Sequence, residues 1–150
     1  MRVRLVLSLI TILLLVTIAS GVPSDSKYSY GLIQRTCAPW DGAAIALTLA
    51  TKPVECKRVP TSDYLNIGVW RGLPIHDGQT VKFTSVSDDG FASRCSKANN
   101  CERAESGEIT FDTFKEGASA TGHYELRFKG GEVLSGKFDV KWCEFREFCG

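Results

Sequence analysis

The sequence predicts an all-β fold, an antiparallel β-sandwich of about seven strands held together by disulfide bonds. Three observations predict it. Apolar and polar residues alternate with a period of two over several short segments, the pattern of strands with one buried face. Turn-forming residues separate these segments at a spacing typical of sandwiches and barrels. Six cysteines follow an apolar N-terminal run in a chain of 150 residues, which indicates an exported, disulfide-bonded domain. A β-barrel is the alternative architecture.

The N-terminal segment is typical of a secretory signal peptide covering residues 1–21. Two arginines open it, an aliphatic run follows over residues 5–18, and Ala19, Ser20 and Gly21 provide a cleavage site. The run is short for a helix that crosses a bilayer, which needs about 20 residues. We therefore predict that residues 22–150 form a single secreted or periplasmic domain with no membrane attachment after cleavage.

The predicted mature domain is close to neutral. The chain has 18 basic and 17 acidic residues, and the leader holds two arginines and no acid, which leaves 16 against 17 and a net charge of −1. Such a surface gives no electrostatic reason to bind nucleic acid or acidic membranes.

Four strands are predicted before the central cysteines. Alternating apolar residues place them at 28–32, 43–50, 65–70 and 81–85. The alanines of the second segment would also suit a helix, but its eight residues lie between a turn and Pro53 and are few for one. The connections 51–62 and 87–106 are long and irregular, which favours crossovers between two sheets.

Three consecutive strands are predicted between Gly107 and Trp142, and the turn joining the last two sets their register. A two-residue loop of Gly130 and Gly131 would pair residues of opposite faces, because side chains alternate along a strand. A three-residue loop at 129–131 instead pairs Leu126 with Leu134 and Tyr124 with Gly136. We predict this second loop, with Gly131 at positive φ.

Two glycines, Gly122 and Gly136, fall on the inward face of these strands. Glycine inside a strand usually marks a bulge or the close approach of another group. We expect both positions to make room for a neighbouring aromatic ring.

The cysteines all lie in the predicted mature domain, and their even number implies disulfide bonds. They are Cys37, Cys56, Cys95, Cys101, Cys143 and Cys149. We predict a local bond between Cys95 and Cys101. Cys143 could pair with Cys149, which lies at the same spacing, or across the sheet with Cys37 or Cys56. A bond at Cys149 would hold a chain end that otherwise frays. Zinc sites use more closely spaced ligand pairs.

No motif for catalysis, a metal or a nucleotide stands out, so we predict no cofactor. His76 and Asp77 could pair a base with a carboxylate, but neighbours on an extended chain point apart, and Asp77 begins a turn. Asp88 and Asp89 could offer oxygens to calcium, yet calcium loops need acids at several alternating positions. The sequence contains no nucleophile elbow and no phosphate-binding glycine loop.

Two tryptophans give the best candidate binding surface. Trp40 lies in a short loop after Cys37, and Trp70 lies on the face opposite Ile67 and Val69. Exposed tryptophans at such places often anchor protein or sugar partners, although Trp40 could instead pack on the core. The candidate residues are Trp40, Asp41, Trp70, Arg71, His76 and Asp77.

The C-terminal half resembles that of uncharacterised exported bacterial β-domain proteins. The resemblance covers residues 95–143 and is carried by the stretches 101–111, 120–128, 136–138 and 142–143. The shared outline is a strand that begins at glycine, a linker of small residues, a hairpin and a terminal Trp-Cys. It implies a secreted or periplasmic β-domain and no particular activity.

These features predict a non-catalytic binding or structural domain whose partner is another protein or a component of the cell envelope or extracellular space. Three alternatives remain open. The loop at 37–42, stiffened at both ends, would suit an inhibitor of a secreted hydrolase. A small hydrolase could use His76. A lipid or small-molecule carrier would need an apolar cavity of roughly several hundred Å³.

Overall fold

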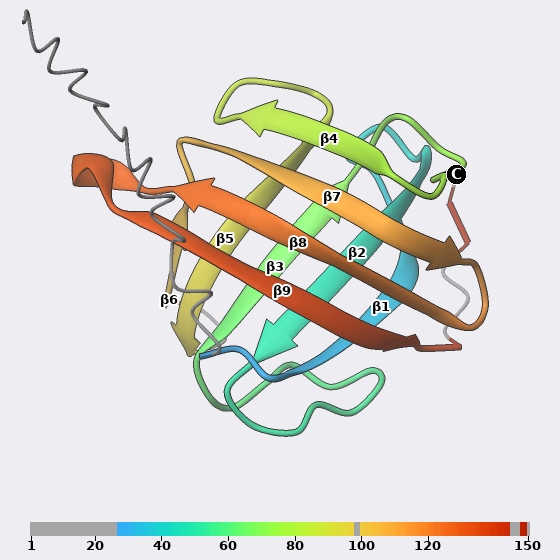
Figure 1. Ribbon diagram of the computed structural model, residues 1–150, viewed down its shortest axis with the longest axis horizontal. Helices are drawn as coiled ribbons and strands as arrows, with labels where there is room; N and C mark the ends of the chain where they lie inside the picture. The colour runs from blue at the N-terminus through green and yellow to red at the C-terminus, as the bar shows by residue number, and fades with distance from the viewer. Residues whose placement is uncertain (1–26, 98–99, 145–147, 150) are drawn as a thin grey trace, which may run out of the picture.

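The fold is all-β, as the sequence predicts. The computed structural model describes residues 27–97, 100–144 and 148–149, which form nine strands and one 3-10 turn (Figure 1). The strands are β1 (Tyr30–Cys37), β2 (Ala43–Ala50), β3 (Tyr64–Val69), β4 (Gln79–Thr84), β5 (Gly90–Lys97), β6 (Asn100–Arg103), β7 (Ser106–Lys115), β8 (Ser119–Arg127) and β9 (Val133–Trp142). The predicted signal peptide lies outside the described residues. Within the described ranges, no helix has the length and apolar character needed to span a bilayer.

All nine strands belong to one mixed sheet that curls over on itself. Their order is β4-β7-β8-β9-β1-β2-β3-β5-β6, and every neighbouring pair is antiparallel except β9 and β1. In Figure 1, β4, β7, β8 and β9 cross in front of β1, β2, β3 and β5. Buried apolar side chains from both halves form the core between them, including Leu47 and Leu65 from one half and Phe111 and Leu126 from the other.

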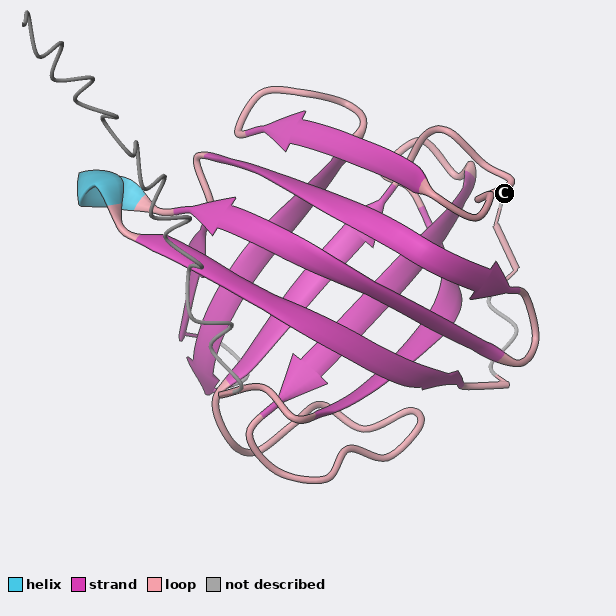
Figure 2. Ribbon diagram, viewed as in Figure 1, coloured by secondary structure: helices cyan, strands magenta, loops and turns pink. Residues whose placement is uncertain are grey.

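The prediction of a seven-strand sandwich is not confirmed. The region 87–106, which we expected to be an irregular crossover, contains β5 and β6, paired as a hairpin. β5 has no apolar alternation because its fully buried residue is the small Ala92, whereas Phe91 belongs to the other face. The parallel pairing of β1 with β9 then joins both halves into one continuous sheet. Figure 2 shows this sheet with the long β2–β3 connection at one end.

The first strand also differs from its prediction. β1 runs over Tyr30–Cys37 rather than 28–32, and its fully buried residue is Ile33. The sequence did not predict the second half of β1, because the residues after Ile33 are polar. β1 lies between two other strands, and yet Arg35 is exposed. The predicted strand at 43–50 is confirmed as β2, over the helix.

The predicted hairpin register is confirmed. Leu126 pairs with Leu134 and Tyr124 pairs with Gly136. The 3-10 turn Lys129–Gly131 forms the loop, and both of its glycines have a φ of 82°. The Phe128 amide donates to the Glu132 carbonyl at 2.9 Å, which closes the loop. The alternation of side chains between the two faces of the strands was therefore enough to predict the length of the turn.

The inward glycines make room for aromatic rings, as expected. A Cβ on Gly136 would lie 2.5 Å from the Tyr124 hydroxyl oxygen, and one on Gly122 would lie 2.6 Å from the Phe138 ring. The same Gly122 Cβ would lie 2.0 Å from the Thr110 carbonyl oxygen, next to a bulge in β7. Both sites use the absence of a side chain to pack the core closely.

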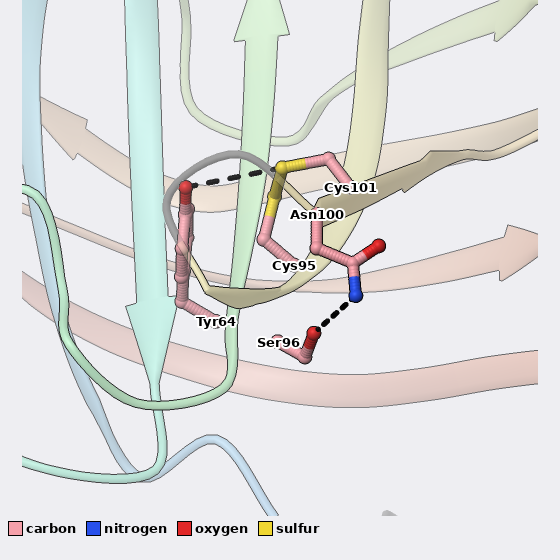
Figure 3. Close-up of a disulfide and its surroundings, with 5 residues drawn as sticks. All are labelled: Tyr64, Cys95, Ser96, Asn100 and Cys101. Carbon is pink, nitrogen blue, oxygen red and sulfur yellow. Dashed lines mark hydrogen bonds between the residues drawn. A yellow bond between two sulfur atoms is a disulfide. The ribbon is translucent and has the colours of Figure 1, made fainter.

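Three disulfide bonds join all six cysteines: Cys37–Cys149, Cys56–Cys143 and Cys95–Cys101. The predicted Cys95–Cys101 bond is confirmed, and Cys143 pairs with Cys56 rather than with Cys37 or Cys149. Figure 3 shows the local bond between β5 and β6, where the Tyr64 hydroxyl donates to the Cys101 sulfur at 3.9 Å. Three disulfides fit an oxidising compartment, outside the cell or in the periplasm.

Candidate functional site

A groove of about 390 Å³ lies on the outer face of β1, β2 and β3, which we call the outer groove. Its floor consists of side chains opposite the core-facing ones: Leu32, Gln34, Thr36, Ala46, Thr48, Tyr64 and Asn66. Its wall belongs to the β2–β3 connection and is formed by Glu55, Lys57, Arg58, Val59 and Pro60. The register aligns the floor across the strands, since Thr48 pairs with Leu32 on one side and with Asn66 on the other.

The wall of the groove is held in place from several directions. Cys56 is bonded to Cys143, the residue after β9, and Cys143 is buried at 1% exposure. The Arg58 guanidinium lies 2.9 Å from the Glu55 carboxylate. The Thr51 amide donates to the Asp63 carbonyl at 3.1 Å, which closes the base of the connection. A ligand would therefore meet a wall that is already ordered.

Three aromatic rings extend the same sheet face beyond the groove, and we call them the aromatic row. The ring centroids of Trp40 and Trp70 are 6.0 Å apart, and those of Trp70 and Phe91 are 5.2 Å apart. The Arg71 guanidinium lies 5.2 Å from the Trp40 ring, and that of Arg103 lies 5.8 Å from the Phe91 ring. Both distances fit cation–π contacts.

Gly68 connects the aromatic row to the groove. It pairs with Ala46 of the groove floor on one side and with Phe91 on the other. A Cβ on Gly68 would lie 2.3 Å from the Phe91 ring and 3.2 Å from the Trp70 indole nitrogen. Both aromatic side chains therefore occupy the space above Gly68, directly beside the groove floor. The row therefore lies on the same sheet face as the groove, next to Ala46 of its floor.

The β1–β2 turn positions Trp40 at the end of this row. The Ala38 amide donates to the Gly42 carbonyl at 2.7 Å, and the Asp41 amide donates to the Ala38 carbonyl at 2.9 Å. Asp41 has a φ of 63°, a conformation that aspartate tolerates better than most residues. Trp40 packs against Trp70 but keeps 47% of its surface exposed.

The structure brings together four of the six candidate residues and places the other two, His76 and Asp77, elsewhere. Trp40 and Asp41 share the β1–β2 turn, and Trp70 and Arg71 meet Trp40 from the end of β3. The Asp77 carboxylate instead accepts a hydrogen bond from the Phe114 amide at 2.7 Å. The preceding residue, His76, is exposed. Asp77 thus fastens the β3–β4 loop to β7.

Sequence reasoning missed Phe91, Arg103 and the groove floor. Gly68 could have signalled them, because it is a glycine on the same strand face as Trp70, where a neighbouring ring could lie. The partner ring follows only from the pairing of β3 with β5, which the sequence did not predict.

A separate charged cluster covers one end of the core. Arg94 lies 2.7 Å from the Glu102 carboxylate and 2.5 Å from that of Glu132, with its guanidinium 4.4 Å from the Phe128 ring. The hydrogen bond from Arg94 holds the pKa of the Glu132 carboxyl below its ordinary value. Burial raises the pKa of the Tyr28 phenol, which lines a hollow of about 330 Å³ with Arg94. This cluster shields Phe128 from solvent.

A mostly apolar hollow of about 300 Å³ lies elsewhere, between β2, the β3–β4 loop and the end of β7. Ile45, Leu73 and Phe114 line it, and so do Arg35 and Glu116, whose side chains form an ion pair. In the part of the chain that the structure describes, no three His, Cys, Asp or Glu side chains gather as ligands for a metal ion.

Comparison of the chain with protein-family models, with curated proteins and with solved structures finds no match. The resemblance over residues 95–143 stays a prediction. Fold and site together define the class: an all-β, disulfide-bonded domain with an ordered groove and an adjoining aromatic row.

Proposed function

We propose that the protein is an exported, non-catalytic binding domain whose ligand lies along the outer groove and against the aromatic row. The partly exposed Trp40 carries this proposal, because its contact with Trp70 places it on the same sheet face as a groove with an ordered wall. Tryptophan and arginine dominate binding energy at many interfaces, and Arg71 contacts Trp40 here. A pre-ordered site also loses little conformational entropy on binding. The three disulfides support a secreted or periplasmic location.

The inhibitor alternative receives less support from the β1–β2 turn. A loop that blocks a hydrolase must project into the enzyme, whereas two internal hydrogen bonds fold this turn back on itself. Its Trp40 packs on Trp70 of the same sheet. The turn therefore serves the aromatic row better than it would serve an inserted loop.

The hydrolase and carrier alternatives each need a feature that the geometry does not favour. A hydrolase needs His76 in a cleft beside an acid or a hydroxyl, but His76 is exposed and Asp77 accepts from a backbone amide. A carrier of this shape would hold its ligand between the two halves of the sheet, and buried side chains such as Phe111 and Leu65 fill that space.

The proposal is tested by binding of the labelled mature protein to an envelope preparation of the organism that produces it. Trp40→Ala should weaken binding about 30-fold, the equivalent of about 2 kcal/mol for a central tryptophan. Val133→Ala is the control, because Val133 is also an exposed apolar residue, 44% exposed, but lies at the start of β9. Equal binding by wild type and Trp40→Ala would rule out this surface.

A further inference from the structure

We infer that the ligand of the outer groove is a neutral glycan chain, an inference that rests on the proposed binding function. The first observation is the chemistry of the floor. Gln34, Thr48 and Asn66 are half-buried amide and hydroxyl side chains on one face of three adjacent strands. Each can both donate and accept a hydrogen bond. Sugar hydroxyl groups have the same dual character, so the floor matches them without needing a charge.

The polar groups of this floor are available to a ligand. Within residues 27–97, 100–144 and 148–149, the side chains of Gln34, Thr48 and Asn66 have no hydrogen-bond partner. No polar side-chain atom among the described residues is both fully buried and without a partner, so their atoms remain open to the groove. Three adjacent strands thus present hydrogen-bonding groups that the fold itself does not use.

The aromatic row supplies the second half of sugar recognition. A sugar ring has an apolar C–H face as well as a hydroxyl rim, and exposed indole surface can pack against that face. Trp40 offers such surface, and Gly68 places the Phe91 and Trp70 rings beside the floor. A chain of sugars could therefore contact the hydroxyl and amide groups and the aromatic rings at once.

The sheet geometry disfavours an extended peptide in this groove. Peptides that bind sheets usually add a strand at an edge through backbone hydrogen bonds. The groove floor belongs to β1, β2 and β3, and each of them already has a strand on both sides. The edges of the described sheet are β4 and β6, away from the floor. A ligand in the groove must therefore bind through contacts with side chains.

The groove floor has no charge that would select an anionic ligand, since its residues are all uncharged. Of the wall cations, Arg58 is paired with Glu55 and Lys57 also has an interaction partner. Beside the aromatic row, Arg71 lies 3.6 Å from Asp88, and Arg103 contacts the Phe91 ring. A neutral chain needs no free cation. The groove volume of about 390 Å³ falls within the roughly 300–1,000 Å³ typical of small-ligand sites, enough for a short segment of a longer chain.

The test is co-sedimentation of the purified, disulfide-bonded protein with insoluble cellulose, chitin, β-1,3-glucan and starch. Wild type should sediment with at least one of the four. Trp40→Ala should weaken that binding at least about tenfold and Asn66→Ala about two- to tenfold, as expected when an aromatic contact or a groove hydrogen bond is lost. A cooperative thermal unfolding transition confirms that each variant is folded.

A matched control lies on the outer face of the other half of the sheet. Thr48→Val removes a hydroxyl from the groove floor, and Thr110→Val removes one from β7, where Thr110 and Thr80 hydroxyl oxygens are 2.8 Å apart. Thr48→Val should weaken binding and Thr110→Val should not. Failure of wild type to bind any of the four polysaccharides, or equal binding by Asn66→Ala, would overturn the glycan inference.

One further treatment separates this inference from the proposed function. The envelope preparation is oxidised with periodate, which cleaves vicinal diols of sugars, or digested with protease. Loss of Trp40-dependent binding only after periodate supports a glycan ligand. Loss only after protease overturns the glycan inference while the binding function stands, with a protein as the partner. If wild type and Trp40→Ala bind the untreated envelope equally, both proposals fail.

Discussion

Gly68→Ala tests whether the aromatic row depends on a missing side chain. The added Cβ would lie 2.3 and 2.7 Å from two atoms of the Phe91 ring and 3.2 Å from the Trp70 indole nitrogen. Contacts below about 3 Å do not persist, so the Phe91 ring must move away from the sheet. The change should therefore disturb the row without touching the core on the other face.

The magnitude follows from three contributions. The Trp70–Phe91 contact contributes about 0.5–1.5 kcal/mol, and overpacking typically costs about 1–3 kcal/mol. Alanine also restricts the unfolded chain more than glycine does, which stabilises the folded state by about 0.4–1 kcal/mol. Phe91 is only half-buried and can swing outward, so the overpacking term should be near its lower end. We expect a net loss of about 1–2 kcal/mol, or about 3–8 °C in Tm for a domain of this size.

Urea unfolding of a double-mutant cycle provides the assay. With the ring removed in Phe91→Ala, the methyl group of Gly68→Ala has space, and its cost should fall to nearly zero. Near-UV circular dichroism should change in Gly68→Ala, because the Trp70 environment changes. An unchanged stability of Gly68→Ala, or the same cost with and without Phe91, would refute the reasoning.

Three further outcomes follow from the packing, the disulfides and the charges. Phe111→Ala should lower the free energy of unfolding in urea by about 3–5 kcal/mol, because Phe111 is 0% exposed. Phe148→Ala should change it by less than about 0.5 kcal/mol, because Phe148 is 91% exposed. Similar losses in the two variants would contradict the assigned core. Replacing Cys37 and Cys149 by alanine should lower the free energy of unfolding by about 5 kcal/mol, and replacing Cys95 and Cys101 should lower it by about 2 kcal/mol. The reason is that the two bonds span separations of 112 and 6 residues. A larger loss for the second pair would refute the chain-entropy explanation. The pKa of Glu132 is lowered by Arg94, so its contribution is complete above the ordinary pKa of 4.5 and is lost as pH falls through the folded value. Glu132→Gln should flatten the acid side of the stability–pH profile, and a profile with the wild-type slope would speak against the ion pair.

The sequence was most informative where one strand face was apolar and the other charged. In β8 and β9 this alternation predicted both the buried residues and the pairing of Leu126 with Leu134, because a shift by one residue would have exposed them. It was least informative in β5, where Ala92 faces the core and Phe91 lies on the outer face. A strand with a small residue on its core face and an aromatic residue on its outer face does not show the expected alternation of apolar and polar residues.

The candidate site was likewise predictable from the sequence only in part. Trp40 and Trp70 were identifiable from their local sequence, since one lies in a short turn and the other opposite the apolar face of its strand. Phe91 was not identifiable, because it reaches Trp70 only through the pairing of β3 with β5. The role of Asp77 was also hidden, because its partner is the Phe114 amide, 37 positions away.

The sequence by itself determined the all-β class, the presence of disulfides and the hairpin register, because these depend on local alternation, cysteine number and turn parity. Only the tertiary structure decided that nine strands form one curled sheet, which cysteines pair and that a groove adjoins the aromatic row. These features depend on contacts between distant segments, such as Leu32 with Lys141 and Cys56 with Cys143. No local pattern records such contacts, because each requires two segments to be placed by the rest of the fold.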